Sequence, residues 1–117
     1  MKVLTVLVPT YNVEKYLRRC LDSLLLPEVL EEIEVLVVND GSKDGSADIA
    51  RAYEKKYPQT VVFVDKENGG HGSTINVGIE KAQGTYFKVL DSDDWVNIGD
   101  FIEFVKRLKE ETADAVI

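Results

Sequence analysis

The chain has 117 residues and a formal net charge of −7, which excludes a nucleic-acid-binding surface because such surfaces need clustered Lys and Arg. Its length fits one domain, residues 1–117, and its hydrophobic fraction of 44% fits a folded protein with a real core. No apolar run approaches the roughly 20 residues of a membrane span or the length of a signal-peptide core. We therefore expect a cytoplasmic protein with no membrane span in this segment.

Short β-branched runs alternate along the chain with stretches of helical period. This alternation predicts an α/β protein with three layers, α/β/α, around a mostly parallel sheet. The strand runs are almost continuously apolar, as a sheet covered on both faces requires. Each helical stretch is expected to bury one apolar stripe, which includes Ile79 in the third helix and Phe104 in the fourth. In chain order the expected elements are a strand over Val3–Val8, a helix from Tyr16 to Leu24, a strand over Glu34–Val38, a helix around Ile49 and Tyr53, a strand over Thr60–Val64, a helix around Ile75 and Ile79, a strand over Tyr86–Leu90 and a helix from Phe101 through Phe104 to Leu108.

Three local features refine this order. Ser46 and Ser73 are candidate N-caps of the second and third helices. The single cysteine, Cys20, lies on an apolar helix face and is expected in the core. Residues 114–117 resemble the first part of a fifth strand, so we expect the chain to be the N-terminal part of a longer protein, truncated at its C-terminus.

Polar residues and glycines collect in the loops that follow the expected strands. The carboxyl ends of parallel strands meet at one edge of a sheet, which is where ligands bind in open α/β folds. The sequence therefore predicts one site at this edge. The loops concerned are residues 9–12, 39–42, 65–72 and 91–94.

The last of these loops, Asp91-Ser92-Asp93-Asp94, places three carboxylates within four positions. Side chains two apart on extended backbone point the same way, so Asp91 and Asp93 would face one ligand while Ser92 turns away. A hard cation such as Mg²⁺ or Mn²⁺ would relieve their repulsion, and such ions complete their shell with substrate phosphates. The alternative is a solvated turn in which Asp94 or Asn97 caps the next helix.

The ordered set of loop motifs resembles the donor-binding half of the family 2 inverting glycosyltransferases, which have the GT-A fold. The resemblance spans nearly the whole chain. Each motif by itself is weak, and their order and spacing carry the match. The motifs are Val8-Pro9-Thr10-Tyr11-Asn12, Val37-Val38-Asn39-Asp40-Gly41-Ser42, Asp44-Gly45-Ser46, Asn68-Gly69-Gly70, Asn76-Val77-Gly78, Ala82-Gln83-Gly84-Thr85-Tyr86 and Leu90-Asp91-Ser92-Asp93-Asp94.

The resemblance implies a metal-assisted transfer of a sugar, with inversion, from a nucleotide-diphosphate sugar to an acceptor hydroxyl in glycan biosynthesis. The donor would be a UDP-sugar, with Asp40 accepting the imide N–H of uracil. Asp93, in a DXD motif with Asp91, would be the principal ligand of Mn²⁺ or Mg²⁺. The nucleotide-sugar-binding residues implied are Pro9, Thr10, Tyr11, Asn12, Asp40, Asn68, Gly70, Asn76, Asp91 and Ser92.

Two departures from the family pattern matter. The chain has Thr74-Ile75-Asn76 where the family commonly has Ala-Arg-Asn, so an arginine near the donor is missing. The catalytic base and the site for a glycan or lipid-linked acceptor are expected beyond Ile117, and a lipid-linked acceptor would bring the full-length protein to a membrane.

Other interpretations of the same residues stay open at this point. The chain would then be a non-catalytic nucleotide-sugar-binding module, or a phosphatase of the haloacid dehalogenase type that uses Asp91 and Asp93. Asp40-Gly41 also fits a simple turn, and His71, the single histidine, fits either a surface position or a contact to the donor.

Overall fold

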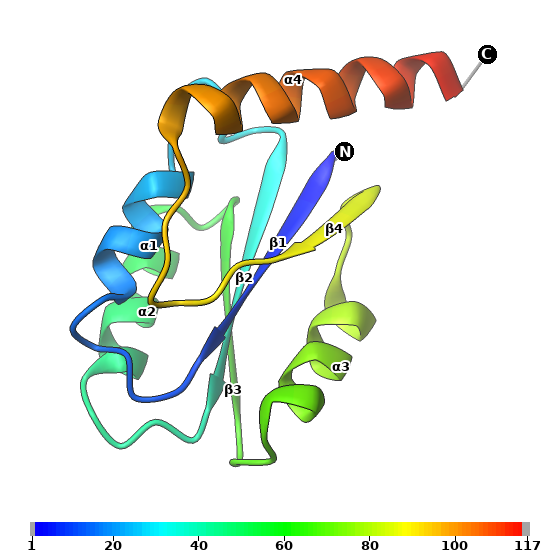
Figure 1. Ribbon diagram of the computed structural model, residues 1–117. Coiled ribbons are helices and arrows are strands. Elements are labelled where there is room, and N and C mark those ends of the chain that lie inside the picture. The colour runs from blue at the N-terminus through cyan, green and yellow to red at the C-terminus, as the bar shows by residue number, and fades with distance from the viewer. Residues whose placement is uncertain (1, 116–117) are drawn as a thin grey trace.

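The computed structural model describes residues 2–115, which form a four-stranded, wholly parallel sheet with helices on both faces (Figure 1). The strand order is β3-β2-β1-β4. This arrangement confirms the predicted three-layer α/β/α architecture. The elements are β1 (Leu4–Thr10), α1 (Leu17–Leu24), β2 (Ile33–Asp40), α2 (Ser46–Lys56), β3 (Val61–Lys66), α3 (His71–Lys81), β4 (Tyr86–Val89) and α4 (Ile98–Ala115).

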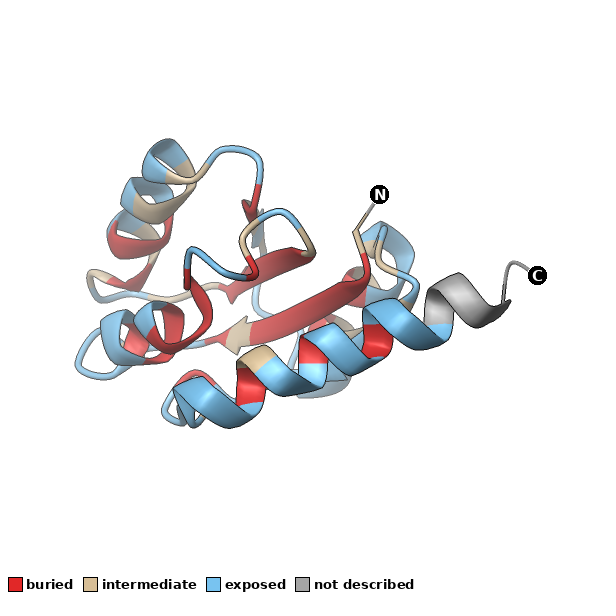
Figure 2. Ribbon diagram, turned by 90° about the horizontal axis from the view of Figure 1, so that it is seen from above, coloured by how far each residue is buried: buried red, intermediate tan, exposed pale blue. Residues whose placement is uncertain are grey.

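The two faces of the sheet bury two separate apolar clusters. Alternate residues of a strand point to opposite faces, so Val6 and Val8 of β1 pack with α1, α2 and α4, whereas Leu7 packs towards α3. The larger cluster contains Leu17, Cys20 and Leu21 of α1, which confirms Cys20 as a core residue. The central strands are buried and the outer helix faces are exposed (Figure 2).

The strands continue further into the polar loops than the hydrophobic pattern predicts. Asn39 and Asp40 are the last residues of β2 and pair in register with Asp65 and Lys66 of β3. Thr10 likewise pairs with Asn39 at the end of β1. Parallel pairing therefore fixes these polar residues on rigid backbone and brings Lys66 beside Asp40.

Three predictions from the hydrophobic pattern, two about helix faces and one about a strand, are wrong. Ile79 and Phe104 are 59% and 41% exposed, because α3 packs through Thr74 and Gly78, and α4 through Phe101, Val105 and Leu108. Asp114 and Ala115 belong to α4 rather than to a fifth strand, since they continue a segment rich in helix-forming residues. Residues 116–117, the rest of that expected strand, lie outside the described residues. No helix within residues 2–115 is long and apolar enough to cross a membrane.

The predicted serine caps are also wrong. Ser46 is the first residue of α2, and its backbone N–H donates to Asp44 Oδ1 at 2.9 Å. Asp44 therefore accepts from an N–H of the first turn that has no partner within the helix. Ser46 Oγ instead accepts from Val13 N at 3.0 Å, which ties the loop after β1 to α2. Ser73 lies inside the first turn of α3, whose N-cap is Gly70.

The turn between α3 and β4 is fixed by hydrogen bonds to two buried side chains, those of Thr5 and Glu34, at the sheet edge opposite the strand ends named above. Glu34 Oε1 accepts from Thr5 Oγ1 and from Gln83 N, both at 2.9 Å. Thr5 Oγ1 in turn accepts from Gly84 N at 2.8 Å. Glu34 is 5% exposed, so each of its bonds replaces water that the core excludes.

Candidate functional site

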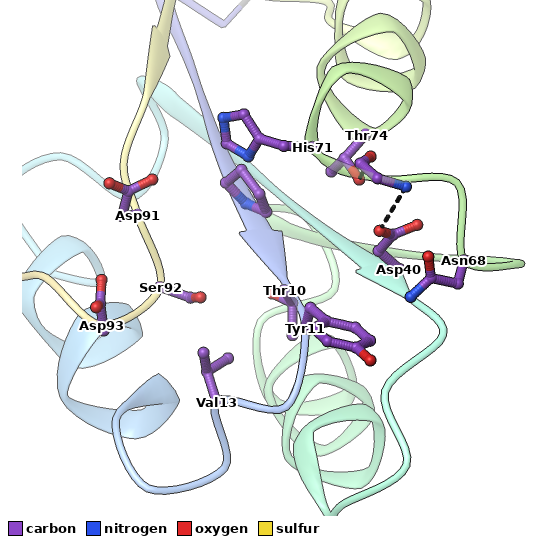
Figure 3. Close-up of a pocket in the computed structure, with 12 residues that line it drawn as sticks. Thr10, Tyr11, Val13, Asp40, Asn68, His71, Thr74, Asp91, Ser92 and Asp93 are labelled. Carbon is purple, nitrogen blue, oxygen red and sulfur yellow. Dashed lines mark hydrogen bonds between the residues drawn. The ribbon is translucent and has the colours of Figure 1, made fainter.

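A cleft of about 620 Å³ lies across the carboxyl ends of the strands, where the sequence predicts a site (Figure 3). The acidic turn 91–93 forms one side, Asp40 and Asn68 form the other, and Tyr11 lies between them. This volume is within the usual range for small-ligand pockets. The lining residues are Pro9, Thr10, Tyr11, Val13, Asp40, Asn68, Gly70, His71, Thr74, Asp91, Ser92 and Asp93.

Residues 91–94 form a tight turn and not the extended segment that the sequence suggested. Asp94 N donates to Asp91 O at 2.9 Å, which closes the turn. In a turn the two-residue alternation of side chains does not hold, so Ser92 points into the cleft instead of away from it (Figure 3). Ser92 is 5% exposed, whereas Asp91 and Asp93 are exposed on either side of it.

Cys20 supports this acidic turn from the core. Its Sγ lies 3.8 Å from the carbonyl oxygen of Asp91, to which the thiol donates. Burial, together with the nearby charges of Asp94, Asp93 and Asp91, raises the pKa of the Cys20 thiol to about 12. The thiol is therefore protonated at neutral pH and keeps its donor role.

The two cleft carboxylates suit a divalent cation that a ligand also coordinates. Asp91 and Asp93 both line the cleft and offer hard oxygen ligands. Among the side chains that the structure describes, no group of three His, Cys, Asp or Glu is arranged to hold a metal ion. Mg²⁺ typically takes one or two protein carboxylates plus phosphate and water, so the residues present fit such an ion together with a phosphate ligand.

Asp40 organises the glycine-rich loop that follows β3. Its Oδ1 accepts from Lys66 Nζ at 2.6 Å and from Gly69 N at 2.8 Å, and its Oδ2 accepts from Gly70 N at 3.0 Å. Gly70 has φ +89, a conformation that glycine adopts without strain. Gly41, with φ +75, allows the glycine-rich loop to pass close to the backbone that follows β2, because a Cβ at residue 41 would lie 3.0 Å from Asn68.

The protonation of Asp40 affects the stability of the folded state, because the fold stabilises the charged form of this carboxyl group. Burial raises its pKa, but the hydrogen bonds from Lys66, Gly69 and Gly70 outweigh this and hold the pKa below that of an ordinary aspartate. A carboxyl with a lowered folded-state pKa stabilises the fold above its unfolded pKa of about 3.9, and this contribution disappears as the pH falls through the folded value.

We expect the stability difference between the wild type and Asp40→Asn to be greatest near neutral pH and to shrink below about pH 4. Urea unfolding midpoints measured from pH 7 to pH 2 check this. A difference that stays constant over the whole range would contradict it.

In the loop after β1, some residues line the cleft and others hold neighbouring backbone segments together. Tyr11 is 49% exposed in the cleft, whereas the buried Thr10 donates its hydroxyl to Val8 O at 3.1 Å. Asn12, with φ +51, does not line the cleft. Its Oδ1 accepts from Lys43 N at 2.8 Å and its N–H donates to Ser42 Oγ at 2.9 Å. Asn12 therefore joins the loops after β1 and β2.

The cleft gathers most of the predicted site residues and adds others. Asn76, predicted to bind a ligand, is exposed on α3 and does not line the cleft. Val13 and Thr74 line the cleft without having been predicted as site residues, although Thr74 begins the Thr74-Ile75-Asn76 segment noted in the sequence. His71, left undecided from the sequence, is the first residue of α3 and lines the cleft. Lys66, which does not line the cleft, donates to Asp40 Oδ1, and its position opposite Asp40 follows from the register between β2 and β3.

Comparisons with known proteins agree on one family. The family described as "Glycosyl transferase family 2" matches residues 5–117. The chain is 38% identical over 115 residues to glycosyltransferase GlyA of Streptococcus pneumoniae serotype 4, covering 97% of the chain and 16% of GlyA. Its curated relatives are thus longer proteins, of which it matches one part.

Two solved structures show the same fold. Staphylococcus aureus TarS 1–349 in complex with UDP-GlcNAc superposes with a TM-score of 0.78 at 34% identity, covering 94% of this chain and 32% of that one. The mannosyltransferase PcManGT of Pyrobaculum calidifontis, in complex with GDP-Man and Mn²⁺, gives a TM-score of 0.77 at 27% identity, covering 88% and 31%. The two neighbours therefore hold donors with different bases.

Proposed function

The chain belongs to glycosyl transferase family 2, and on this premise we propose that its cleft binds a UDP-sugar donor together with Mn²⁺ or Mg²⁺. The observation that carries the proposal is the single cleft that brings Asp40 together with Asp91 and Asp93. One end offers a buried acceptor for a base, and the other offers carboxylates for a cation and its phosphates. Membership in this family also rules out the phosphatase interpretation of Asp91 and Asp93.

The base end of the proposed site is formed by Tyr11, Asp40 and Asn68. The carboxylate of Asp40 would accept the imide N–H of uracil at the floor of the cleft. Asn68 presents an amide that can donate to a uracil carbonyl, and the exposed ring of Tyr11 offers a flat apolar surface to the base. Hydrogen bonding plus stacking is how proteins commonly recognise an unstacked base.

The diphosphate end is formed by the acidic turn. Asp93, with Asp91, would hold the cation, and Asp91 and Ser92 would also face the ribose and donor sugar. When bound, the cation supplies positive charge that stabilises the leaving nucleoside diphosphate. The closed turn 91–94 and the thiol of Cys20 beneath it hold the backbone that carries the two carboxylates.

The complete reaction is proposed for the full-length protein. The chain spans 16% of GlyA and about a third of each neighbour structure. We propose that the full-length protein transfers the sugar, with inversion, to a hydroxyl of a glycan or lipid-linked acceptor. In that protein the described cleft would bind the donor and its metal ion.

Thermal unfolding with UDP tests donor binding. At 100 times its dissociation constant, UDP is expected to add about 2.7 kcal/mol and raise the Tm by roughly 10 °C in the presence of Mn²⁺. With a chelator the rise should largely disappear, since the diphosphate would then meet two uncompensated carboxylates. An equal rise in both conditions would refute the role of the metal, and no rise in either would refute donor binding.

A further inference from the structure

Lys66 is the charged residue in contact with Asp40, and the donor-binding proposal gives it no role. It is the last residue of β3, and the strand register places it directly opposite Asp40. Its ammonium lies 2.6 Å from Asp40 Oδ1 and 2.7 Å from the carbonyl oxygen of Glu67. The side chains of Lys66 and Asp40 are 15% and 8% exposed, so this ion pair is largely removed from water. A pair in such a position holds both partners in fixed geometry.

The contacts around Asp40 use three of its acceptor positions. A carboxylate has two oxygens with about four lone-pair positions. Lys66 Nζ and Gly69 N occupy Oδ1, and Gly70 N occupies one position of Oδ2. Within residues 2–115 no further donor to Oδ2 is found, so one of its acceptor positions is left for a ligand in the cleft that Asp40 lines.

We propose that Lys66 determines base specificity by saturating Oδ1 and thereby leaving Asp40 able to accept one N–H instead of two. This inference rests on the proposed role of Asp40 in base recognition. Uracil presents a single imide N–H between two carbonyl groups, which matches one open acceptor. Guanine presents two parallel donors, N1–H and the 2-amino group, which together need both carboxylate oxygens. A guanine bound here leaves its amino group facing an oxygen that is already saturated, and an unsatisfied buried donor costs affinity.

The nucleotide that isolates this effect is IDP. Hypoxanthine has the size and shape of guanine and keeps N1–H, but it lacks the 2-amino group. IDP, GDP and UDP share the diphosphate, so contributions from the metal and the acidic turn cancel when affinities are compared. For the wild type in saturating Mg²⁺, isothermal titration calorimetry is expected to give UDP the highest affinity and IDP at least a tenfold higher affinity than GDP.

The variants test whether Lys66 causes the difference. Lys66→Met removes the donor to Oδ1 and is expected to bring the IDP-to-GDP affinity ratio close to 1. Lys66→Arg keeps a donor at this position and should retain the ratio. Lys81→Met, the same change on the exposed last turn of α3, is the matched control and should bind as the wild type does. A purely structural role for Lys66 would lower both affinities together and leave the ratio unchanged.

Each outcome of these titrations decides one of two questions. Binding of none of the three nucleotides by the wild type would refute the proposed function itself. UDP binding with equal IDP and GDP affinities would overturn the role of Lys66 and leave donor binding standing. UDP binding without detectable binding of either purine nucleotide would assign the selectivity to base size and also overturn it. An IDP-to-GDP affinity ratio in Lys66→Met equal to that of the wild type would also overturn the role of Lys66. If Lys66→Met does not fold, the IDP-to-GDP affinity ratio of the wild type decides whether the role of Lys66 stands.

Discussion

Asp93→Asn is expected to lower the affinity for UDP in Mn²⁺ by roughly 100-fold, about 2.7 kcal/mol, while leaving the free energy of unfolding without ligand nearly unchanged. Asp93 is exposed in the cleft and closes no hydrogen bond of the turn, which is held by Asp94 N and Asp91 O. The substitution therefore removes the charge of the proposed cation ligand and none of the hydrogen bonds that close the turn. Under the proposed function, the diphosphate then loses most of the positive charge that attracts it.

The matched control is Asp94→Asn, one residue along. Asp94 is also exposed and carries the same charge, but it does not line the cleft, and its Oδ1 accepts from the adjacent Trp95 N at 2.8 Å. Calorimetric titration of UDP into both variants, with and without Mn²⁺, separates a local role from general electrostatics. Equal losses in the two variants would attribute the effect to net charge and contradict a ligand role for Asp93.

Gly84→Ala is expected to destabilise the fold by about 3 kcal/mol, which lowers the Tm by roughly 10–20 °C. A Cβ at residue 84 would lie 2.5 Å from Thr5 N and 2.7 Å from the carbonyl carbon of Leu4. These are backbone atoms of the central strand β1, so no side chain can rotate away to make room. Relief would require the turn to move and break the Gly84 N to Thr5 Oγ1 hydrogen bond.

Gly72→Ala provides the control for the change of residue type. Gly72 is the second residue of α3, and a Cβ there would meet nothing within 4 Å. Alanine has the higher helix propensity, so this variant should be as stable as the wild type or more stable by up to about 1 kcal/mol. Denaturant unfolding of both variants measures the contrast, and a similar stability for the two would show that the α3–β4 turn tolerates displacement.

The acidic cluster in the cleft and the net charge of −7 both disfavour an anionic ligand. Under the proposed function, an anionic donor would approach a molecule whose net charge repels it, and Asp91 and Asp93 add further negative charge in the cleft. Asp40 is neutralised by Lys66 within the fold, whereas no Lys or Arg is among the residues that line the cleft beside the two carboxylates of the turn. A divalent cation is therefore expected to be a condition for binding the donor.

The hydrophobic pattern was enough to predict the strands and their parallel arrangement. Runs such as Val3–Val8 are too continuously apolar for a surface element, and helices of 3.6-residue period between them leave few alternatives to an α/β/α sandwich. The loop motifs then predicted where the site lies, since parallel strands place all their carboxyl ends at one edge. Pro9, Thr10, Tyr11, Asp40, Asn68, Gly70, Asp91, Ser92 and Asp93 all line the one cleft found there.

Other features depended on contacts between residues far apart in the sequence. The direction of Ser92 depends on a turn closed by its neighbours, and the exposure of Ile79 depends on the close approach of Gly78 to Leu7. Asn12 binds the backbone at Lys43, 31 residues away, instead of lining the cleft. A periodicity argument describes one segment at a time, so it cannot show which face of a helix another element will cover.

By itself the sequence determined the fold class and the edge of the sheet that carries the site, because hydrophobic period and strand-end chemistry are local properties of the chain. The tertiary structure decided how the acceptor positions of Asp40 are shared. The pairing of Lys66 with Asp40 follows from the register between β2 and β3, which is set by packing over the whole sheet and has no local sequence mark.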